Sequence, residues 1–287
     1  MQKRRLCSLF LSSISPPVST EKTKPFQINK NGVEIFYKKY FSLQLYENTI
    51  ETLVVGNSHG FYGYMAEESR HEINACDPSQ DLYYSYKIYD KYANAPKLKN
   101  IILFYSVFSP GYLIELSPEE WRSDLYRFFF DIPYRFSTEY EKRPVLNDLA
   151  SLIADVKNAP HDFHYMGNCP HTAFNPPDTD PETRAKAHLK GAVRDENQNS
   201  YLELMAKRAD EKGHGLYVVL PPYRSDYTSF LPSFEETFSA LLKLKDINII
   251  SFFSDKRFSD SDFGDTDHLN ENGAKKLTDL IREEINE

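Results

Sequence analysis

The stretch TIETLVVGNSHG, at residues 49–60, decides how this chain folds. It begins with β-branched and apolar residues and ends in Gly-Asn-Ser-His-Gly. A continuous apolar run, in place of an alternating one, is typical of a strand that is buried on both faces of a parallel sheet. The two glycines around Ser58 predict a tight turn at the end of this strand. Ser58 is therefore either a small polar residue that fills a turn or a nucleophile held at the tip of a strand.

Four more apolar runs repeat this theme along the chain. They lie at 71–76, 100–108, 215–222 and 247–253. Helical patterns separate them, and the clearest of these lie at 79–95, 182–213, 233–245 and 271–285. Strands that alternate with helices predict βαβ units with right-handed crossovers. We therefore expect an α/β protein with a five-stranded parallel sheet sandwiched between helices, in a flavodoxin-like three-layer arrangement.

The domain organisation follows from the same runs. A length of 287 residues fits one large domain, or one domain with an insertion. We assign residues 1–35 to an N-terminal leader segment and residues 36–287 to a single domain. Residues 109–180 contain many aromatic residues and prolines but no clear strand, and a connection of this length is rarely a simple loop. We expect an inserted cap, partly helical, that lies over the carboxyl edge of the sheet, where such folds bind ligands.

Charge and cysteine content exclude several classes of protein. With 34 basic against 42 acidic residues and a net charge of −8, the chain is not expected to bind nucleic acid, because phosphate contacts need clustered cations. No stretch approaches the ~20 apolar residues of a membrane span, so any membrane association is expected to be peripheral. Three widely spaced cysteines favour a reducing compartment. The N-terminus imitates a signal peptide without a cleavage site, so we expect a cytoplasmic protein, and any membrane association would be at the inner face. Export is the less favoured alternative.

A catalytic serine needs a base that takes its proton and a third group that orients the base. The stretch DFGDTDHLNENG, at residues 262–273, supplies both, because Asp265 precedes His268 by three residues, after the fifth strand and before the last helix. One turn of chain lets the carboxylate reach Nδ1 of the imidazole, so that Nε2 can face a serine at the tip of a neighbouring strand. Either motif alone is weak evidence. Their order and their positions at strand and helix boundaries together predict a Ser58–His268–Asp265 triad.

In two places, Gly56-Asn57-Ser58 and Asp265-Thr266-Asp267-His268, the chain resembles the SGNH (GDSL-like) hydrolase superfamily. Within it, the chain looks like the branch that contains bacterial polysaccharide O-acetyltransferases and related envelope proteins. The resemblance implies a five-stranded parallel sheet and a nucleophilic serine. It also implies a serine-dependent O-acetyltransferase that acts on a bacterial surface polysaccharide or its precursor. Acetyl-CoA would be the donor, a polysaccharide or oligosaccharide the acceptor, and no cofactor would be bound.

The chain departs from the superfamily at the oxyanion hole. The superfamily uses the N–H of the nucleophile, a glycine after the second strand and an asparagine after the third. Here the second strand runs into Asp-Pro-Ser-Gln, and no asparagine follows the third. Loss of one oxyanion donor lowers the rate by a factor of about 10²–10³, so an active enzyme needs substitutes. We expect the N–H of Ser58 as one donor and Ser79, Gln80 and Ser109 as the candidates for the others.

Three alternatives stay open at this point. The pattern Gly-x-Ser-x-Gly is also the nucleophile elbow of α/β-hydrolases, although that fold places the elbow after several strands. A triad would serve a carbohydrate esterase as well as a transferase. The missing oxyanion residues would suit a non-catalytic glycan-binding or assembly protein that has kept the fold.

Three residues are candidates for substrate binding. His59 adjoins the predicted nucleophile, with a structural role as the equal alternative. Tyr223 and Arg224 follow the fourth strand in LPPYRSDY, and an aromatic face beside an arginine suits a sugar or an anionic donor.

The stretch HDFHYMGNCPH, at residues 161–171, contains the ligand types of a zinc site in His161, His164, Cys169 and His171. Their spacing matches no familiar zinc signature, and the stretch is rich in loop-forming residues. We therefore expect no metal site here, and histidines that face solvent or substrate.

Overall fold

The structure is a computed structural model that describes residues 30–136, 145–158, 164–171, 180–191, 198–245 and 247–286. Most of the predicted leader lies outside these ranges. Its last residues, however, form the start of the first helix, α1 (Lys30–Tyr46), and Val33 within them is fully buried. Residues 30–35 therefore belong to the folded domain and not to a leader.

The five strands form one sheet, all of them parallel, in the order β2-β1-β3-β4-β5. They are β1 (Thr52–Gly56), β2 (Glu72–Asn74), β3 (Asn100–Phe104), β4 (Gly215–Leu220) and β5 (Asn248–Ser251). Every residue of β1 is buried, as its unbroken apolar run predicted. The predicted α/β fold with a five-stranded parallel sheet is confirmed.

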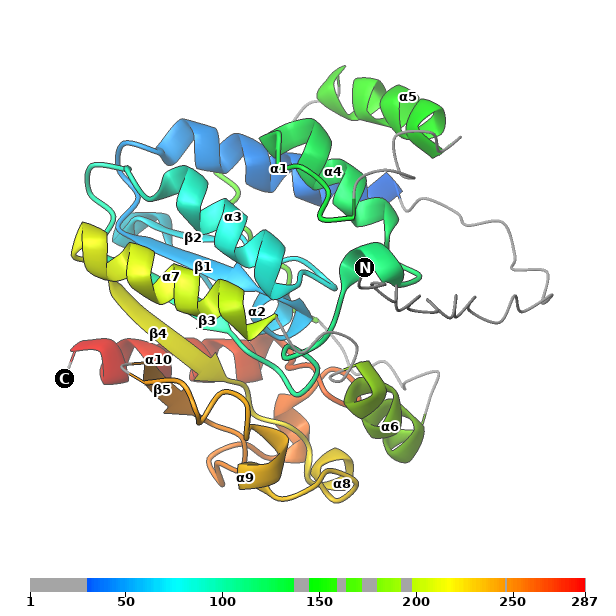
Figure 1. Cartoon of the computed structure of the whole chain (residues 1–287), viewed down its shortest axis with the longest axis vertical. Helices are drawn as coiled ribbons and strands as arrows, with labels where there is room; N and C mark the ends of the chain where they lie inside the picture. The colour runs from blue at the N-terminus through cyan, green and yellow to red at the C-terminus, as the bar shows by residue number, and fades with distance from the viewer. Residues whose placement is uncertain are drawn as a thin grey trace, which may run out of the picture.

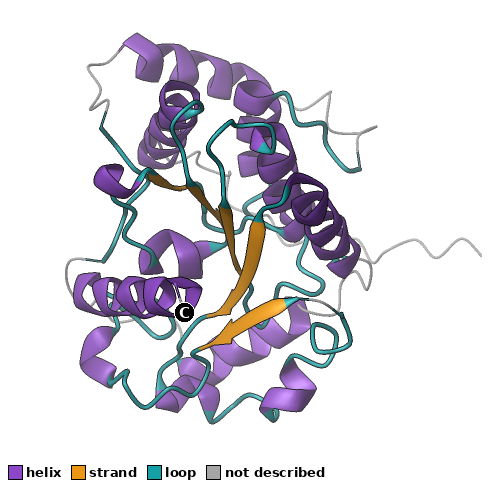
Figure 2. Ribbon diagram, turned by 90° about the vertical axis from the view of Figure 1, so that its left-hand side faces the viewer, coloured by secondary structure: helices purple, strands orange, loops and turns teal. Residues whose placement is uncertain are grey.

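Helices cover both faces of the sheet, and Figure 2 shows the strands enclosed between them. Besides α1, the longer helices are α3 (Leu82–Tyr92), α4 (Trp121–Phe130), α5 (Val145–Asn158), α6 (Pro181–Gly191), α7 (Asn199–Lys212) and α10 (Glu271–Asn286). The short ones are α2 (Ser58–Gly63), η1 (Glu68–Arg70), η2 (Ile114–Leu116), α8 (Ser225–Thr228), α9 (Phe234–Thr237) and η4 (Asp260–Asp262). In Figure 1, α3 and α7 pack side by side in front of the sheet and α10 lies behind it, against α2. Within the described ranges, no helix is long and apolar enough to cross a membrane.

The predicted insertion at 109–180 is only partly where we expected it. Its described part contains η2, α4 and α5 and, apart from an isolated bridge at His171, no strand. Helices α4 and α5 pack against α1, at the side of the molecule, and not over the carboxyl edge of the sheet (Figure 1). Of the described residues of the insertion, Tyr112 and His171 lie at that edge. The helix that covers it, α6, begins at Pro181, directly after the predicted boundary.

Candidate active site

Ser58 lies where strand β1 turns into helix α2. Gly56 ends the strand with φ 132°, a conformation that favours glycine, and a Cβ there would lie 2.7 Å from the carbonyl oxygen of Phe104. Asn57 then caps the helix, and Ser58 is its first residue. The N–H of Ser58 is one of those that a helix leaves without an internal acceptor. The glycine therefore allows the sharp turn that carries the serine to the edge of the sheet.

The side chain of Asn57 fixes this turn to the end of strand β3. Its Oδ1 accepts hydrogen bonds from the N–H of His59 at 3.1 Å and from the hydroxyl of Ser106 at 2.9 Å, and its Nδ2 donates to Ser109 Oγ at 3.2 Å. Asn57 and Ser106 are buried. The hydrogen bonds of Asn57 therefore fix the backbone turn that carries Ser58.

The loop before α10 brings His268 and Asp265 to the serine. Nε2 of His268 lies 2.9 Å from Ser58 Oγ, and Nδ1 of His268 lies 2.8 Å from Asp265 Oδ2. The other carboxylate oxygen, Oδ1, accepts hydrogen bonds from the N–H groups of Asp267 at 3.0 Å and of His268 at 2.8 Å. The three side chains that the sequence singled out are therefore in hydrogen-bond contact, in the order serine, histidine, aspartate.

The charges around His268 favour its protonated form. Burial alone would lower the pKa of His268, but the negative charge of Asp267 and the hydrogen bond with Asp265 raise it above the ordinary value. Burial alone would raise the pKa of Asp265, but its contacts with His171 and His268 hold that pKa well below the usual range. Asp265 is therefore ionised, and it faces an imidazole that can take up a proton.

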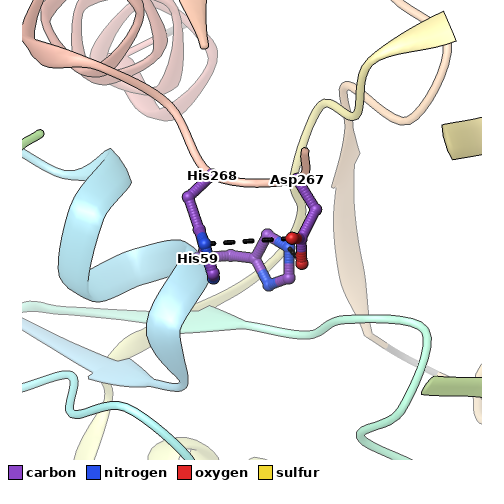
Figure 3. A group of neighbouring side chains, drawn as sticks. All are labelled: His59, Asp267 and His268. Atoms are coloured by element: carbon purple, nitrogen blue, oxygen red, sulfur yellow. Dashed lines mark ion pairs between the residues drawn. The ribbon is translucent and has the colours of Figure 1, made fainter. Parts of the chain in front are cut away.

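A second carboxylate, that of Asp267, also lies near Nδ1 of the imidazole. It is 2% exposed and accepts hydrogen bonds from Nε and Nη2 of Arg184, at 3.1 and 3.3 Å. Figure 3 shows its contacts with the two histidines, and its carboxylate lies 3.5 Å from Nε2 of His59 and 3.9 Å from Nδ1 of His268. Arg184 belongs to α6, so this pair ties the helix over the site to the loop that carries His268.

His59 is buried behind the nucleophile and does not face substrate. It is 3% exposed, and its Nδ1 lies 2.8 Å from Ser106 Oγ. Burial lowers the pKa of His59, which keeps the ring neutral. The expected role in substrate binding is therefore wrong for His59, and its alternative, a structural role in the turn, fits the contacts.

A cavity of about 420 Å³ opens beside Ser58. Ser79 and the aromatic rings of Phe108 and Tyr112 form one side of it. The face of α6 that carries Arg184 and Lys190 forms the other. Its volume falls in the range of small-molecule sites, about 300–1,000 Å³. The candidate nucleophile is thus open to a ligand.

Of the three candidates for the other oxyanion donors, Ser79 lines the cavity, and Gln80 and Ser109 do not. Ser79 lines the cavity and has φ 64°, the left-handed conformation that glycine favours, at the place where the resembled superfamily has glycine. The side chain of Gln80 is 2% exposed and lies in hydrogen-bond distance of the hydroxyls of Ser85 and Tyr126, and its N–H donates to the carbonyl of Asp77. Gln80 therefore points into the core, and the expectation for it is wrong.

Ser109 is also wrong as an oxyanion donor. Its hydroxyl accepts hydrogen bonds from the N–H of Ser106 at 2.9 Å and from Asn57, and its own N–H donates to the carbonyl of Ser106. It is 4% exposed and lies behind the turn. Ser109 supports Asn57 and does not face the cavity.

Tyr223 and Arg224 line a different hollow from the one at Ser58. This second hollow, of about 430 Å³, lies between the loops that follow β4 and β5. The buried ring of Tyr223 stands edge-on to His59, 4.9 Å between centroids, and so separates the hollow from the nucleophile turn. Arg224 pairs with Asp226 at 3.1 Å and Asp260 at 3.7 Å. Tyr223 and Arg224, two of the candidates for substrate binding, therefore lie outside the cavity at Ser58.

The described histidines of the 161–171 stretch, His164 and His171, do not gather into one site. His161 lies outside the described residues. His164 contacts Glu68 at 3.2 Å, before the start of β2. His171 lies at the opposite edge, 3.4 Å from Asp265 Oδ2, with its ring stacked on Tyr62 at 4.1 Å.

Two groups of side chains in the site have donor atoms close enough to surround a cation. One consists of His59, Asp267 and His268, and the other of His171, Asp265 and His268. Both use His268, whose Nε2 contacts Ser58, so a metal in either group would compete with the role of a base. In the first group the guanidinium of Arg184 already neutralises Asp267, which opposes a second cation.

Sequence reasoning missed the residues that surround the triad. Asp267, the second acid of Asp-Thr-Asp-His, belongs to a motif that the sequence analysis uses, but no function was predicted for it. Arg184 and His188 recur four residues apart, on one face of α6, yet nothing local connects that helix to the C-terminal loop. The structure shows that α6 lies over the site, where Arg184 contacts Asp267 and where Arg184 and His188 line the cavity.

No protein-family model, curated protein or solved structure gives a significant match to the chain. The geometry of the site and the resemblance in its two motifs are therefore the observations that bear on function.

Proposed function

We propose that the protein is a serine-dependent O-acetyltransferase that acts on a bacterial surface polysaccharide or its precursor through an acetyl-serine intermediate. The single observation that carries the proposal is the hydrogen-bonded row from Ser58 Oγ through His268 to Asp265, with distances of 2.9 and 2.8 Å. A nucleophile, a base and an orienting carboxylate in contact are what acyl transfer requires. The open cavity beside Ser58 adds the space for a substrate.

The first half-reaction acetylates the serine. Nε2 of His268 accepts the hydroxyl proton while Ser58 Oγ attacks the carbonyl carbon of acetyl-CoA. The carbon–sulfur bond then breaks, and His268 returns the proton to the sulfur, so that CoA leaves as a thiol. Asp265 keeps the proton of the neutral ring on Nδ1 and stabilises the imidazolium. The N–H of Ser58 and the turn at Ser79 are the candidates to stabilise the oxyanion.

The second half-reaction releases the enzyme. A sugar hydroxyl attacks the acetyl carbon of acetyl-Ser58 and gives its proton to His268. The ester bond to Ser58 breaks, the proton passes to Ser58 Oγ, and the acetylated sugar leaves. Water in place of the sugar gives acetate by the same steps, which is the esterase alternative. The family resemblance and the aromatic rings at the cavity support transfer as the proposed reaction.

The test is the intact mass of the protein after incubation with acetyl-CoA. We expect one added acetyl group, absent from Ser58→Ala and from His268→Ala, because loss of either member of such a triad lowers turnover by about 10⁶-fold. Ser117→Ala is the matched control, since Ser117 lines the same cavity and donates its hydroxyl proton to the carbonyl of Ile114.

Each other outcome has a definite meaning. Release of acetate without an acceptor would identify an esterase. An adduct from p-nitrophenyl acetate but not from acetyl-CoA would keep the triad and reject the donor. Absence of any adduct, together with no labelling of Ser58 by a fluorophosphonate, would overturn the proposal and leave a glycan-binding protein as the better account.

A further inference from the structure

Among the described residues, all charged side chains that line the cavity at Ser58 are cationic, although the chain as a whole is acidic. Arg184 and Lys190 contribute these charges, and no Asp or Glu of the described residues lines the cavity. His188 lines it as well, but burial lowers its pKa to about 3 and leaves it neutral. The chain has 42 acidic and 34 basic residues, so a wall with cations alone departs from the general balance.

Two other hollows of the described chain have walls of mixed charge. The hollow at Arg224 also contains the carboxylates of Asp255 and Asp260. The hollow at the amino edge of the sheet combines Glu51 and Glu72 with two arginines. A hollow lined by one sign of charge concentrates ligands of the opposite sign, whereas mixed walls cancel.

The two cationic side chains of α6 that line the cavity differ in their partners. Arg184 uses Nε and Nη2 on Asp267, which leaves the outer edge of its five-donor guanidinium on the cavity side, and its side chain is 35% exposed. Lys190 is exposed and pairs with no carboxylate of the described part of the chain. Lys186, on the same helix, forms instead an ion pair with Glu182 and does not line the cavity.

We propose that the cavity at Ser58 binds a substrate through an anionic group, a phosphate or a carboxylate, held by Lys190 and the outer edge of Arg184. This inference rests on the proposed function, because it names the class of substrate that reaches Ser58. The anion has two possible sources in that reaction. One is the phosphates of the CoA donor, and the other is the carboxylate of an acidic sugar in the acceptor. Phe108 and Tyr112 supply the apolar side against which the uncharged part of either substrate would pack.

The experiment compares Lys190→Ala with Lys186→Ala, which removes the same charge from the same helix outside the cavity. In the donor arm, kcat/KM is measured for acetyl-CoA and for S-acetylpantetheine, which has the same thioester without the phosphates. In the acceptor arm, kcat/KM is measured for oligosaccharides of galacturonic acid and of galactose. We expect Lys190→Ala to lower the charged-to-neutral ratio of kcat/KM about tenfold in one arm, as for loss of a charged hydrogen bond.

The arm that changes identifies the source of the anion, and Lys186→Ala should leave both ratios as in the wild type. Equal ratios in both arms for Lys190→Ala and the wild type would overturn the inference. Failure of the proposed function is distinguishable, because it would abolish turnover of every substrate in the wild type. In that case the Kd of CoA and of galacturonate oligosaccharides, measured by titration calorimetry at low and high salt, replaces kinetics. A Kd that rises about tenfold in Lys190→Ala would then support the anion site without acyl transfer, and unchanged values would overturn it.

Discussion

Two aspartates of one short loop act on His268 in different ways. Asp265 makes the direct hydrogen bond to Nδ1, at 2.8 Å, which fixes the orientation of the ring. Asp267 stands 3.9 Å from the same atom and acts mainly through its charge. Its carboxylate also holds Arg184 and faces His59, so the charge that acts on the imidazole is itself fixed in place. We regard Asp267 as a positioning residue, because it acts through His268 and not on the substrate.

The pH dependence of turnover tests this role. A base must be neutral, and the pKa of His268 is raised above its ordinary value of 6.5, so kcat/KM should rise with pH through a midpoint above 6.5. Asp267→Asn removes a negative charge and leaves Arg184 uncompensated, and both changes lower the pKa of His268. We therefore expect the acidic limb to move to lower pH. The measurement is the pH profile of kcat/KM with p-nitrophenyl acetate.

Asp279→Asn is the control for the pH experiment, since Asp279 lies on α10 with a side chain 70% exposed. Its profile should coincide with that of the wild type. If the acidic limb of the kcat/KM profile has the same midpoint in Asp267→Asn as in the wild type, or a higher one, the role we assign to the charge of Asp267 is contradicted.

At the residue scale, the sequence predicted those parts of the site that have a local pattern. Ser58 sits in a glycine turn after an apolar run, and Asp265 and His268 lie within one turn of chain. The sequence could not predict that Arg184 reaches Asp267, because the two are far apart in sequence and meet only through the packing of α6. Gln80 failed as a candidate for a related reason, since side-chain direction at a turn depends on its tertiary neighbours.

At the scale of elements, one buried carboxylate joins three of them. Asp77 follows β2, in the turn that carries Ser79 to the cavity. Its two oxygens accept hydrogen bonds from Lys39 of α1 at 2.5 Å and from Arg122 of α4 at 2.8 Å. Lys39, which is 3% exposed, also donates to the carbonyl of Cys76. The position of this turn therefore depends on helices at the side of the sheet.

Lys39→Met tests this dependence. The substitution preserves most of the side-chain volume but leaves Asp77 buried with one partner, so we expect a loss of about 3 kcal/mol in the free energy of unfolding. The measurement is urea unfolding followed by circular dichroism. Lys38→Met is the matched control, because the neighbouring Lys38 forms a partly exposed pair with Glu34, worth less than about 1 kcal/mol. Similar losses in the two variants would show that the buried network does not hold the turn.

The elements themselves were largely predictable, and their packing partners were not. Apolar runs located all five strands, because a strand covered on both faces has to be apolar throughout. The insertion was expected over the carboxyl edge, yet α4 and α5 pack on α1. An apolar helix face predicts that the helix packs against the rest of the protein, but it does not identify the neighbour. The positions of α4 and α5 could therefore not be predicted from the sequence.

For the whole molecule, the order of the strands decides where the site lies. The order β2-β1-β3-β4-β5 places β1 and β3 side by side, so that the chain leaves β1 towards one edge and continues from β3 towards the other. Ligands of open α/β sheets bind at the carboxyl ends of the strands where this order reverses. Ser58 follows β1 and Ser106 follows β3, and Asn57 joins the two turns. The topology thus provides the place, and the residues described above provide the chemistry.

The same topology predicts that the molecule unfolds as one unit. The buried core is continuous from Val33 in α1 to Ile281 in α10. Trp121, the single tryptophan of the chain, is 2% exposed in α4 and packs against Gly32 at the start of α1. Its fluorescence reports on the helices at the side of the sheet, whereas far-UV circular dichroism reports on the sheet and on all helices. We expect both signals to have the same midpoint in urea.

Leu277→Ala tests whether α10 unfolds together with the helices that surround Trp121. Leu277 is fully buried in α10, where it faces Gly63 of α2, so its truncation should remove about 2–5 kcal/mol from the free energy of unfolding. If the core is one cooperative unit, the loss will lower the midpoint of Trp121 fluorescence and that of circular dichroism by the same amount, although Trp121 belongs to helices that pack elsewhere. A fluorescence midpoint that stays at the wild-type value while the dichroism midpoint falls would divide the chain into two units. The helices α1 and α4 would then be a separate layer that unfolds independently of the sheet and of the site.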